Sequence, residues 1–158
     1  MPILEHLAHL GDVRAWNGDI PLESLYTAGV AGDRWLRALQ NEGKLYGTRC
    51  AHCEVTYVPA RLYCERCMAH LGDDAWIEVG PAGVVESFTV LRVGLDDRPA
   101  APRIIALLRL DGADTLFVHE LAELGAQKPS IGLRVKAVLK PQAERTASIR
   151  DIAHFSPA

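Results

Sequence analysis

The stretch RCAHCEVTYVPARLYCERC, from Arg49 to Cys67, holds all four cysteines of the chain. They form two Cys-x-x-Cys pairs, Cys50 with Cys53 and Cys64 with Cys67, with ten residues between the pairs. Each pair can form a tight turn that directs two sulfurs at one point, and the intervening residues can fold back as a short hairpin. The spacing therefore predicts one metal ion held by four thiolates.

Zinc is the metal that we expect, because it needs no redox partner and prefers a closed tetrahedral site. An iron centre of the rubredoxin type has the same ligand set and stays open as an alternative. A pair of redox dithiols lacks the usual context of a strand that leads into a helix. His52 and His70 are alternative ligands beside the pairs, but four cysteines suffice. Four thiolates fill the ion, so we expect a structural zinc and no free thiol for nucleophilic catalysis.

The composition is that of an ordinary globular protein, with 49% apolar and 23% charged residues. The formal net charge is -3 and the pI is about 6.0, so no global positive field exists to hold nucleic acid or an anionic membrane. The beginning, MPILEHLAHLGD, lacks the features of a signal peptide, and no apolar run is long enough to span a bilayer. We expect a cytoplasmic protein with reduced thiols, which favours metal over disulfides.

Two short amphipathic helices are expected in residues 1–43, ahead of the cysteine segment. The first covers residues 2–10, and the second begins at Asp33 and ends at Gly43. Their apolar faces carry Leu7, Leu10, Trp35, Leu36 and Leu39. Helices this short are marginal alone in water, so these faces should pack on the rest of the chain or on another protein.

After the cysteine segment, apolar and β-branched runs alternate with turn signals. The expected strands are Trp76–Val79, Gly83–Val93, Arg103–Leu110, Thr115–His119, Leu133–Leu139 and Ser148–Phe155. Residues Glu120–Gln127 are typical of one or two helical turns. This order predicts a Greek-key barrel of the OB type, with a plain barrel or sandwich as the alternative. The chain is therefore predicted to be mainly β, with short N-terminal helices (1–43), a rubredoxin-like zinc ribbon (44–74) and a five-stranded OB-fold barrel (75–158).

The sequence offers no catalytic constellation. His119 lies beside Glu120 and His154 lies close to Asp151, but no serine has the context of a nucleophile elbow. Neither GxxxxGK nor GxGxxG occurs, so no phosphate-binding glycine loop is expected. We therefore predict no catalytic residue in this chain.

The order of these elements resembles the acyl-CoA-associated family of zinc-ribbon and OB-fold proteins. The resemblance covers about Thr27 to Phe155. It is carried by GKLYGTRCAHCEVTYVPARLYCERC (43–67), GVVESFTV (83–90) and IGLRVKAVLKP (131–141). Two departures are local. Glu54 stands where the family usually has glycine, and the stretch VPAR (58–61) has one proline where two are common.

The resemblance implies a non-catalytic, zinc-containing subunit of a heteromeric thiolase-type complex that acts on β-oxoacyl-CoA. The thiolase-like partner would supply the cysteine and histidine chemistry. The zinc ribbon and the apolar faces of the N-terminal helices would then contact the partner, with aromatic anchors at the centre. The cations expected near the phosphates of the CoA thioester are Arg61, Arg134 and Lys136.

Two other functions stay open. A zinc ribbon with an OB barrel also suggests binding of single-stranded nucleic acid, which needs aromatic platforms and a basic groove. Few aromatic residues and a negative net charge disfavour it. A stand-alone acyl-CoA hydrolase would need a nucleophile and a base brought together in the barrel.

Overall fold

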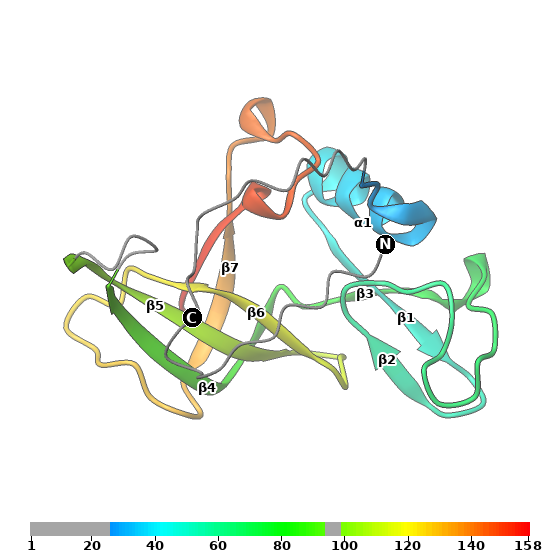
Figure 1. The fold of residues 1–158 in the computed structure, drawn as a ribbon, viewed down its shortest axis with the longest axis horizontal. Helices are drawn as coiled ribbons and strands as arrows, with labels where there is room; N and C mark the ends of the chain where they lie inside the picture. The colour runs from blue at the N-terminus through cyan, green and yellow to red at the C-terminus, as the bar shows by residue number, and fades with distance from the viewer. Residues whose placement is uncertain (1–25, 94–98) are drawn as a thin grey trace, which may run out of the picture.

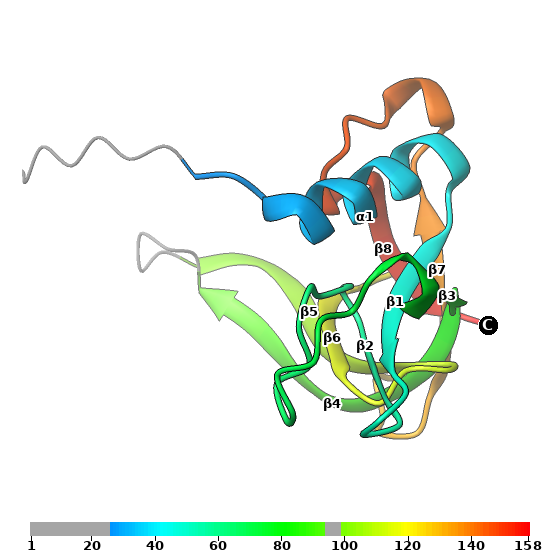
Figure 2. The same cartoon turned by 90° about the vertical axis from the view of Figure 1, so that its right-hand side faces the viewer.

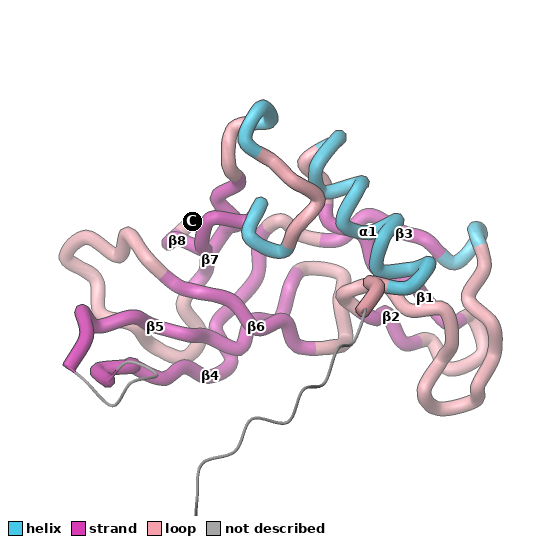
Figure 3. The backbone as a smooth tube through the Cα atoms, turned by 45° about the horizontal axis from the view of Figure 1, so that its top comes forward, coloured by secondary structure: helices cyan, strands magenta, loops and turns pink. Residues whose placement is uncertain are grey.

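The computed structural model of the protein describes residues 26–93 and 99–158, which form two β-sheet units with one α-helix, α1, over the smaller unit (Figure 1). Helix α1 spans Gly29–Glu42. The smaller sheet contains β1 (Leu45–Cys50), β2 (Val55–Tyr57) and β3 (Trp76–Val79), which pair antiparallel in the order β2-β1-β3. Figure 3 shows that much of this unit is loop and that only part of its chain lies in strands.

The larger sheet is a closed barrel of five strands. They are β4 (Ala82–Val93), β5 (Pro99–Leu110), β6 (Leu116–Leu121), β7 (Arg134–Leu139) and β8 (Ile152–Pro157). The order around the barrel is β4-β5-β6-β8-β7, and β4 pairs with β7 to close it (Figure 2). All pairs are antiparallel except β6 with β8, which run parallel and pair at Leu121 and Phe155. This barrel has the OB fold, as the sequence predicts.

Helix α1 is longer than expected at its amino end. It begins at Gly29 rather than Asp33, and it ends at Gly43 as predicted. The φ of Gly43 is 68°, the left-handed conformation that glycine adopts without steric cost. The helix predicted over residues 2–10 lies outside the described residues.

The helix predicted over Glu120–Gln127 is wrong. Strand β6 continues to Leu121, which pairs with Ile104 and is 2% exposed. Beyond it, Glu123 and Gly125 have φ values of 54° and 58°, which are incompatible with a right-handed helix. Burial of Leu121 in the barrel outweighs the local preference of this segment for helix.

Strand β3 belongs to the ribbon sheet by its hydrogen bonding, although the sequence groups it with the barrel. It pairs with β1 along Leu45–Thr48. The chain then turns at Gly80, which has a φ of 64°, and Pro81 has no N–H with which to extend the ladder. The ribbon sheet therefore runs to Val79, and the predicted domain boundaries stay a prediction.

One hydrophobic core joins the helix, the ribbon and the barrel. Trp35 is 2% exposed, its Nε1 donates to the carbonyl of Tyr46 at 2.7 Å, and its ring centre lies 6.1 Å from that of Phe117 in β6. Leu39 is fully buried, and Leu36 packs against the same core. The predicted partner contact is therefore wrong for Trp35 and Leu39, because α1 buries its apolar face on its own chain.

Hydrogen bonds also join the β5–β6 turn of the barrel to ribbon strand β2 and the residue after it. The carboxylate of Asp114 accepts from the N–H of Thr56 at 2.8 Å, and the N–H of Asp114 donates to the carbonyl of Thr56 at 3.0 Å. The Thr115 hydroxyl accepts from the N–H of Val58 at 2.8 Å and donates to its carbonyl at 3.1 Å. The turn thus satisfies backbone groups of the ribbon that need partners when buried.

The β7–β8 connection holds the carboxyl end of α1. The Arg145 guanidinium donates to the carbonyls of Gln40 and Lys140, at 3.3 and 2.9 Å. The Gln40 amide donates to the carbonyl of Arg145 at 3.0 Å, and the Gln142 amide donates to the carbonyl of Asn41 at 3.1 Å. The last carbonyls of a helix have no partner inside it, so these bonds also cap α1.

We expect Trp35→Ala to lower the free energy of unfolding by about 3–5 kcal/mol, because it removes an indole that three parts of the chain share. Urea denaturation followed by circular dichroism measures the change. Val30→Ala, on the same helix but 73% exposed, is the matched control and should change stability by less than about 0.5 kcal/mol. A loss of less than about 1 kcal/mol in Trp35→Ala would contradict a shared core.

Candidate metal centre and neighbouring surfaces

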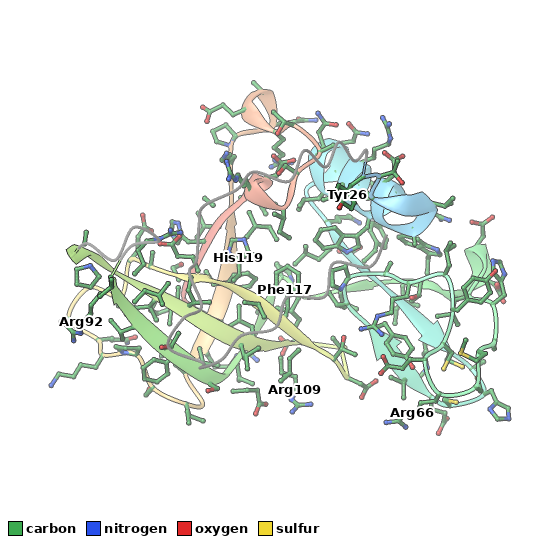
Figure 4. The ribbon with its side chains drawn as sticks, in the orientation of Figure 1. Tyr26, Arg66, Arg92, Arg109, Phe117 and His119 are labelled. Carbon is green, nitrogen blue, oxygen red and sulfur yellow. The ribbon has the colours of Figure 1, made fainter. Side chains whose placement is uncertain are left out.

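Four sulfurs converge at the end of the ribbon that is remote from the barrel (Figure 4). The Sγ atoms of Cys50, Cys53, Cys64 and Cys67 all lie within 4.8 Å of one another, and those of Cys50 and Cys67 are 3.6 Å apart. Cys50 ends β1 and Cys53 lies in the turn to β2, whereas the second pair follows β2. The prediction that the two pairs meet at one point is confirmed.

Each cysteine pair lies in a tight turn that ends in a left-handed residue. Glu54 and Met68 follow the second cysteine of their pairs and have φ values of 55° and 59°. The N–H of Met68 closes the second turn by donating to the carbonyl of Cys64 at 2.9 Å. Glycine adopts this conformation more easily than other residues, but the turn at Glu54 forms without one.

A buried tyrosine contacts one of the four sulfurs. The hydroxyl of Tyr57 lies 3.2 Å from Sγ of Cys64. This hydrogen bond lowers the pKa of Cys64 to about 6 and raises the pKa of Tyr57 to about 12, because it stabilises the thiolate. The pKa of Cys53, in contrast, is raised to about 12, mainly because its thiol forms a hydrogen bond with Cys67. Four sulfurs this close lose their protons together only when a cation shares their charge.

The donor set fits a tetrahedral metal ion. Thiolates select zinc or iron, and four of them complete the coordination of zinc, with no position left for substrate. His52 approaches Cys53 with its Nδ1 3.7 Å from Sγ, and His70 packs against the ring of Tyr63 with centres 5.3 Å apart. Among the described residues the cluster contains the four cysteines and no histidine. An ion here would hold the two turns together.

The three cations predicted to meet CoA phosphates lie on two parts of the fold. Arg61 is in the ribbon, where its guanidinium lies over the ring of Tyr57 at 4.9 Å and pairs with a neighbouring glutamate. Arg134 on β7 donates two bonds of 2.8 Å to the carboxylate of Asp111. Lys136 lies on the same strand, is exposed, and has no ion pair within residues 26–93 and 99–158. Unlike the two arginines, Lys136 therefore has no carboxylate among the described residues to balance its charge.

The sequence does not reveal a cavity of about 710 Å³ beside β6. Its lining brings His119 together with Arg103, Lys140 and Arg150. Figure 4 shows His119 beside Phe117 on β6. Two of these cations come from the β7–β8 connection, so only the folded chain places them near the histidine. Among residues 26–93 and 99–158, no serine or cysteine lines this cavity, so these residues offer it no hydroxyl or thiol nucleophile of that kind.

The fold and the cysteine cluster define a zinc-ribbon and OB-fold protein. The family model for the ChsH2 rubredoxin-like zinc ribbon domain matches residues 40–70, and that for the ChsH2 C-terminal OB-fold domain matches residues 76–140. Together the two matches span more than half of the chain. The protein belongs to the ChsH2 family, and the resemblance seen in the sequence is confirmed.

Two solved structures share the fold. A DUF35-family protein of unknown function from Sulfolobus solfataricus is 26% identical, with a TM-score of 0.56, and the match covers 70% of this chain and 78% of that one. A chain of the structure described as an Ltp2–ChsH2(DUF35) aldolase is 24% identical, with a TM-score of 0.57, and covers 78% and 91%. No curated protein matches the chain at a significant level.

We expect Tyr57→Phe to weaken metal retention by about ten-fold while leaving the fold intact, because Cys64 loses a hydrogen bond that favours its thiolate. The measurement is the chelator concentration that removes half of the metal at fixed pH, followed with a colorimetric zinc indicator. Tyr63→Phe is the matched control, since Tyr63 is 54% exposed and packs on His70 rather than on a sulfur. Equal midpoints for Tyr57→Phe and the natural sequence would show that Tyr57 does not support the metal.

Proposed function

We propose that this protein is a non-catalytic subunit that holds one structural zinc and assembles with a thiolase-type enzyme acting on β-oxoacyl-CoA. One observation carries the proposal: all four cysteines of the chain gather at a single point. A chain with its thiols committed to a metal has none for covalent acyl transfer. The partner would then supply the reactive cysteine and histidine, and the CoA thioester would bind at or near the interface.

A relative of the same fold supports a heteromeric arrangement. The Ltp2–ChsH2(DUF35) aldolase combines a ChsH2 chain with a second protein, Ltp2. We extend that arrangement to this chain, with a thiolase-type enzyme in the place of the second protein. We propose that the CoA phosphates are bound by three cations, Arg61, Arg134 and Lys136. Lys136 is exposed and, among the described residues, has no ion pair that would compete with a phosphate.

The partner surface that we propose lies where the start of α1 meets the second cysteine turn. A shallow pocket of about 200 Å³ is lined by Val30 of α1 together with Leu62 and His70, so the helix and the turn form one surface. The large apolar side chains exposed in residues 26–30 and 62–70, the two segments that we assign to this surface, are Tyr26, Val30, Tyr63 and Met68. Val30 and Met68 are 73% and 72% exposed, so both side chains are accessible to a partner.

The remaining expectations concern residues and properties that the fold does not test. Leu7 and Leu10 lie outside the described residues, and their contact with the partner stays a prediction. A cytoplasmic location also stays a prediction. In the described ranges, 26–93 and 99–158, the protein has no helix with the length and apolar character needed to cross a membrane.

The alternative of single-stranded nucleic-acid binding finds less support on the barrel. Such binding stacks bases on aromatic side chains at the surface of the strands. Phe117 and Phe155 are 3% and 0% exposed and belong to the core. On the other face of β5 and β6, the paired Leu107 and Val118 are aliphatic. We therefore favour a protein partner over a nucleic acid.

We expect the purified chain to show no multiple turnover in β-oxoacyl-CoA cleavage or thioester hydrolysis, because no serine or cysteine of the described residues lines the cavity beside His119. Release of the free CoA thiol, followed spectrophotometrically, measures both reactions. His119→Ala is the control and should give the same background rate. Turnover by the chain alone that His119→Ala abolishes would establish a catalytic site in the barrel and overturn the non-catalytic role.

We expect the chain to co-elute with the thiolase-type enzyme of the same organism after co-expression, at micromolar concentration in size exclusion. Combining Val30→Asp with Met68→Asp should weaken the complex by about ten-fold or more, because charges then replace central apolar contacts. Ile131→Asp is the matched control, since Ile131 is 71% exposed in the β6–β7 connection. Separate elution of the natural sequence, or equal loss with Ile131→Asp, would contradict the proposed interface.

A further inference from the structure

The cavity beside His119 lies at the thinnest seam of the barrel. Strands β6 and β8 pair at the single position of Leu121 and Phe155, whereas the other barrel pairs extend over three or more positions. The 3-10 turn Ile149–Asp151, which leads into β8, lies across the gap from β6 and lines the cavity. A volume of about 710 Å³ falls within the range of small-molecule binding sites.

The wall of this cavity carries a surplus of positive charge. Arg103 donates to both carboxylate oxygens of Glu120, at 3.1 and 2.6 Å, so these two charges compensate each other. Lys140 and Arg150 make no side-chain hydrogen bond or ion pair within the described ranges of the chain. The carboxylate of buried Asp151 accepts from the backbone N–H groups of Thr146 and Ser148, which precede its turn. Two cations without a partner favour an anion between them.

His119 adds a polar atom that also lacks a partner. Its ring stacks on that of Phe117, with centres 6.0 Å apart and planes at 2°, and it meets the ring of Phe155 edge-on at 5.7 Å. Its Nε2 has a long contact of 3.5 Å with the carbonyl of Ile149, and its Nδ1 is buried with no hydrogen bond to any residue of the described ranges. Burial lowers the pKa of His119, so the neutral ring has one N–H to donate. Buried polar atoms of this kind normally find a partner.

An apolar surface continues from the cationic wall. Ile105 and Val118 line both the cavity and an adjoining groove of about 230 Å³ that reaches Phe88. Val118 is 58% exposed, and Ile149 on the other rim is 42% exposed. Two cations at one end and aliphatic side chains at the other match a ligand with an acidic head and an apolar tail.

We propose that this seam cavity binds a small amphipathic anion. Its carboxylate or phosphate lies between Lys140 and Arg150, within reach of His119, and its apolar part runs over Ile105 and Val118. The cations and apolar side chains that line it suit binding of such a ligand, and no serine or cysteine of the described residues lines it. The site belongs to this chain alone, so it depends neither on the partner enzyme nor on the cations proposed for CoA phosphates.

Nuclear magnetic resonance titration of the full chain tests the site. Hexanoate and hexyl phosphate are the probes, and they separate the two kinds of acidic head. Hexanol lacks the charge, and inorganic phosphate lacks the tail. We expect one or both amphipathic anions to shift the signals of His119, Val118 and Ile149. Hexanol and inorganic phosphate should each bind about ten-fold more weakly, because each makes only half of the contacts.

Substitutions locate the binding. Replacing both cavity cations, by Lys140→Gln and Arg150→Gln, should weaken binding of the anions by about ten-fold or more. Lys128→Gln removes one charge from an exposed loop outside the cavity and should leave binding unchanged. The amide spectrum checks that each variant is folded. The proposal is overturned if neither anion shifts these signals, if hexanol or phosphate binds as tightly as the anions, or if Lys128→Gln weakens binding as much as the double substitution.

Discussion

The convergence of four cysteine sulfurs on one point is the constraint on which the ribbon depends. The buried cluster at its tip adds only Val55, Tyr57 and Leu71 to Cys50 and Cys64. A unit of roughly forty residues or fewer seldom buries enough apolar surface to fold unaided, and a structural metal supplies the missing stability. An ion held by the four sulfurs would fix the ends of β1 and β2, and with them the sheet that meets the barrel.

Two sets of contacts, one from the ribbon and one from α1, fix the ribbon against the barrel. Strand β2 and the residue after it bond to the β5–β6 turn through Asp114 and Thr115. From α1, Trp35 packs on Phe117, and Phe117 stacks on His119 at the seam (Figure 4). The ribbon tip, the start of α1 and the seam cavity thus keep a fixed relation to one another. That property is compatible with the proposed role of positioning a partner enzyme.

The sequence predicts the metal ligands and most of the strands because those patterns are local. Features that depend on distant residues are missed. An amphipathic pattern shows that Trp35 has an apolar environment but not that its own barrel provides it. The helix-like stretch after His119 begins as a strand, because Leu121 pairs in the sheet. Lys140 and Arg150 lie far from His119 along the chain, and only the β7–β8 connection brings the three into one cavity.

We propose that the four cysteines hold one closed, structural zinc and that the catalytic chemistry belongs to a partner chain. The absorption spectrum of the cobalt-substituted protein tests it most directly, because cobalt reports the geometry and ligands of a zinc site. For a closed site we expect the intense visible bands of a tetrahedral ion with four thiolates, unchanged when azide or a β-oxoacyl-CoA is added. Weak bands of a five- or six-coordinate ion, or a spectrum that changes on adding azide, would reveal an open position and contradict the account.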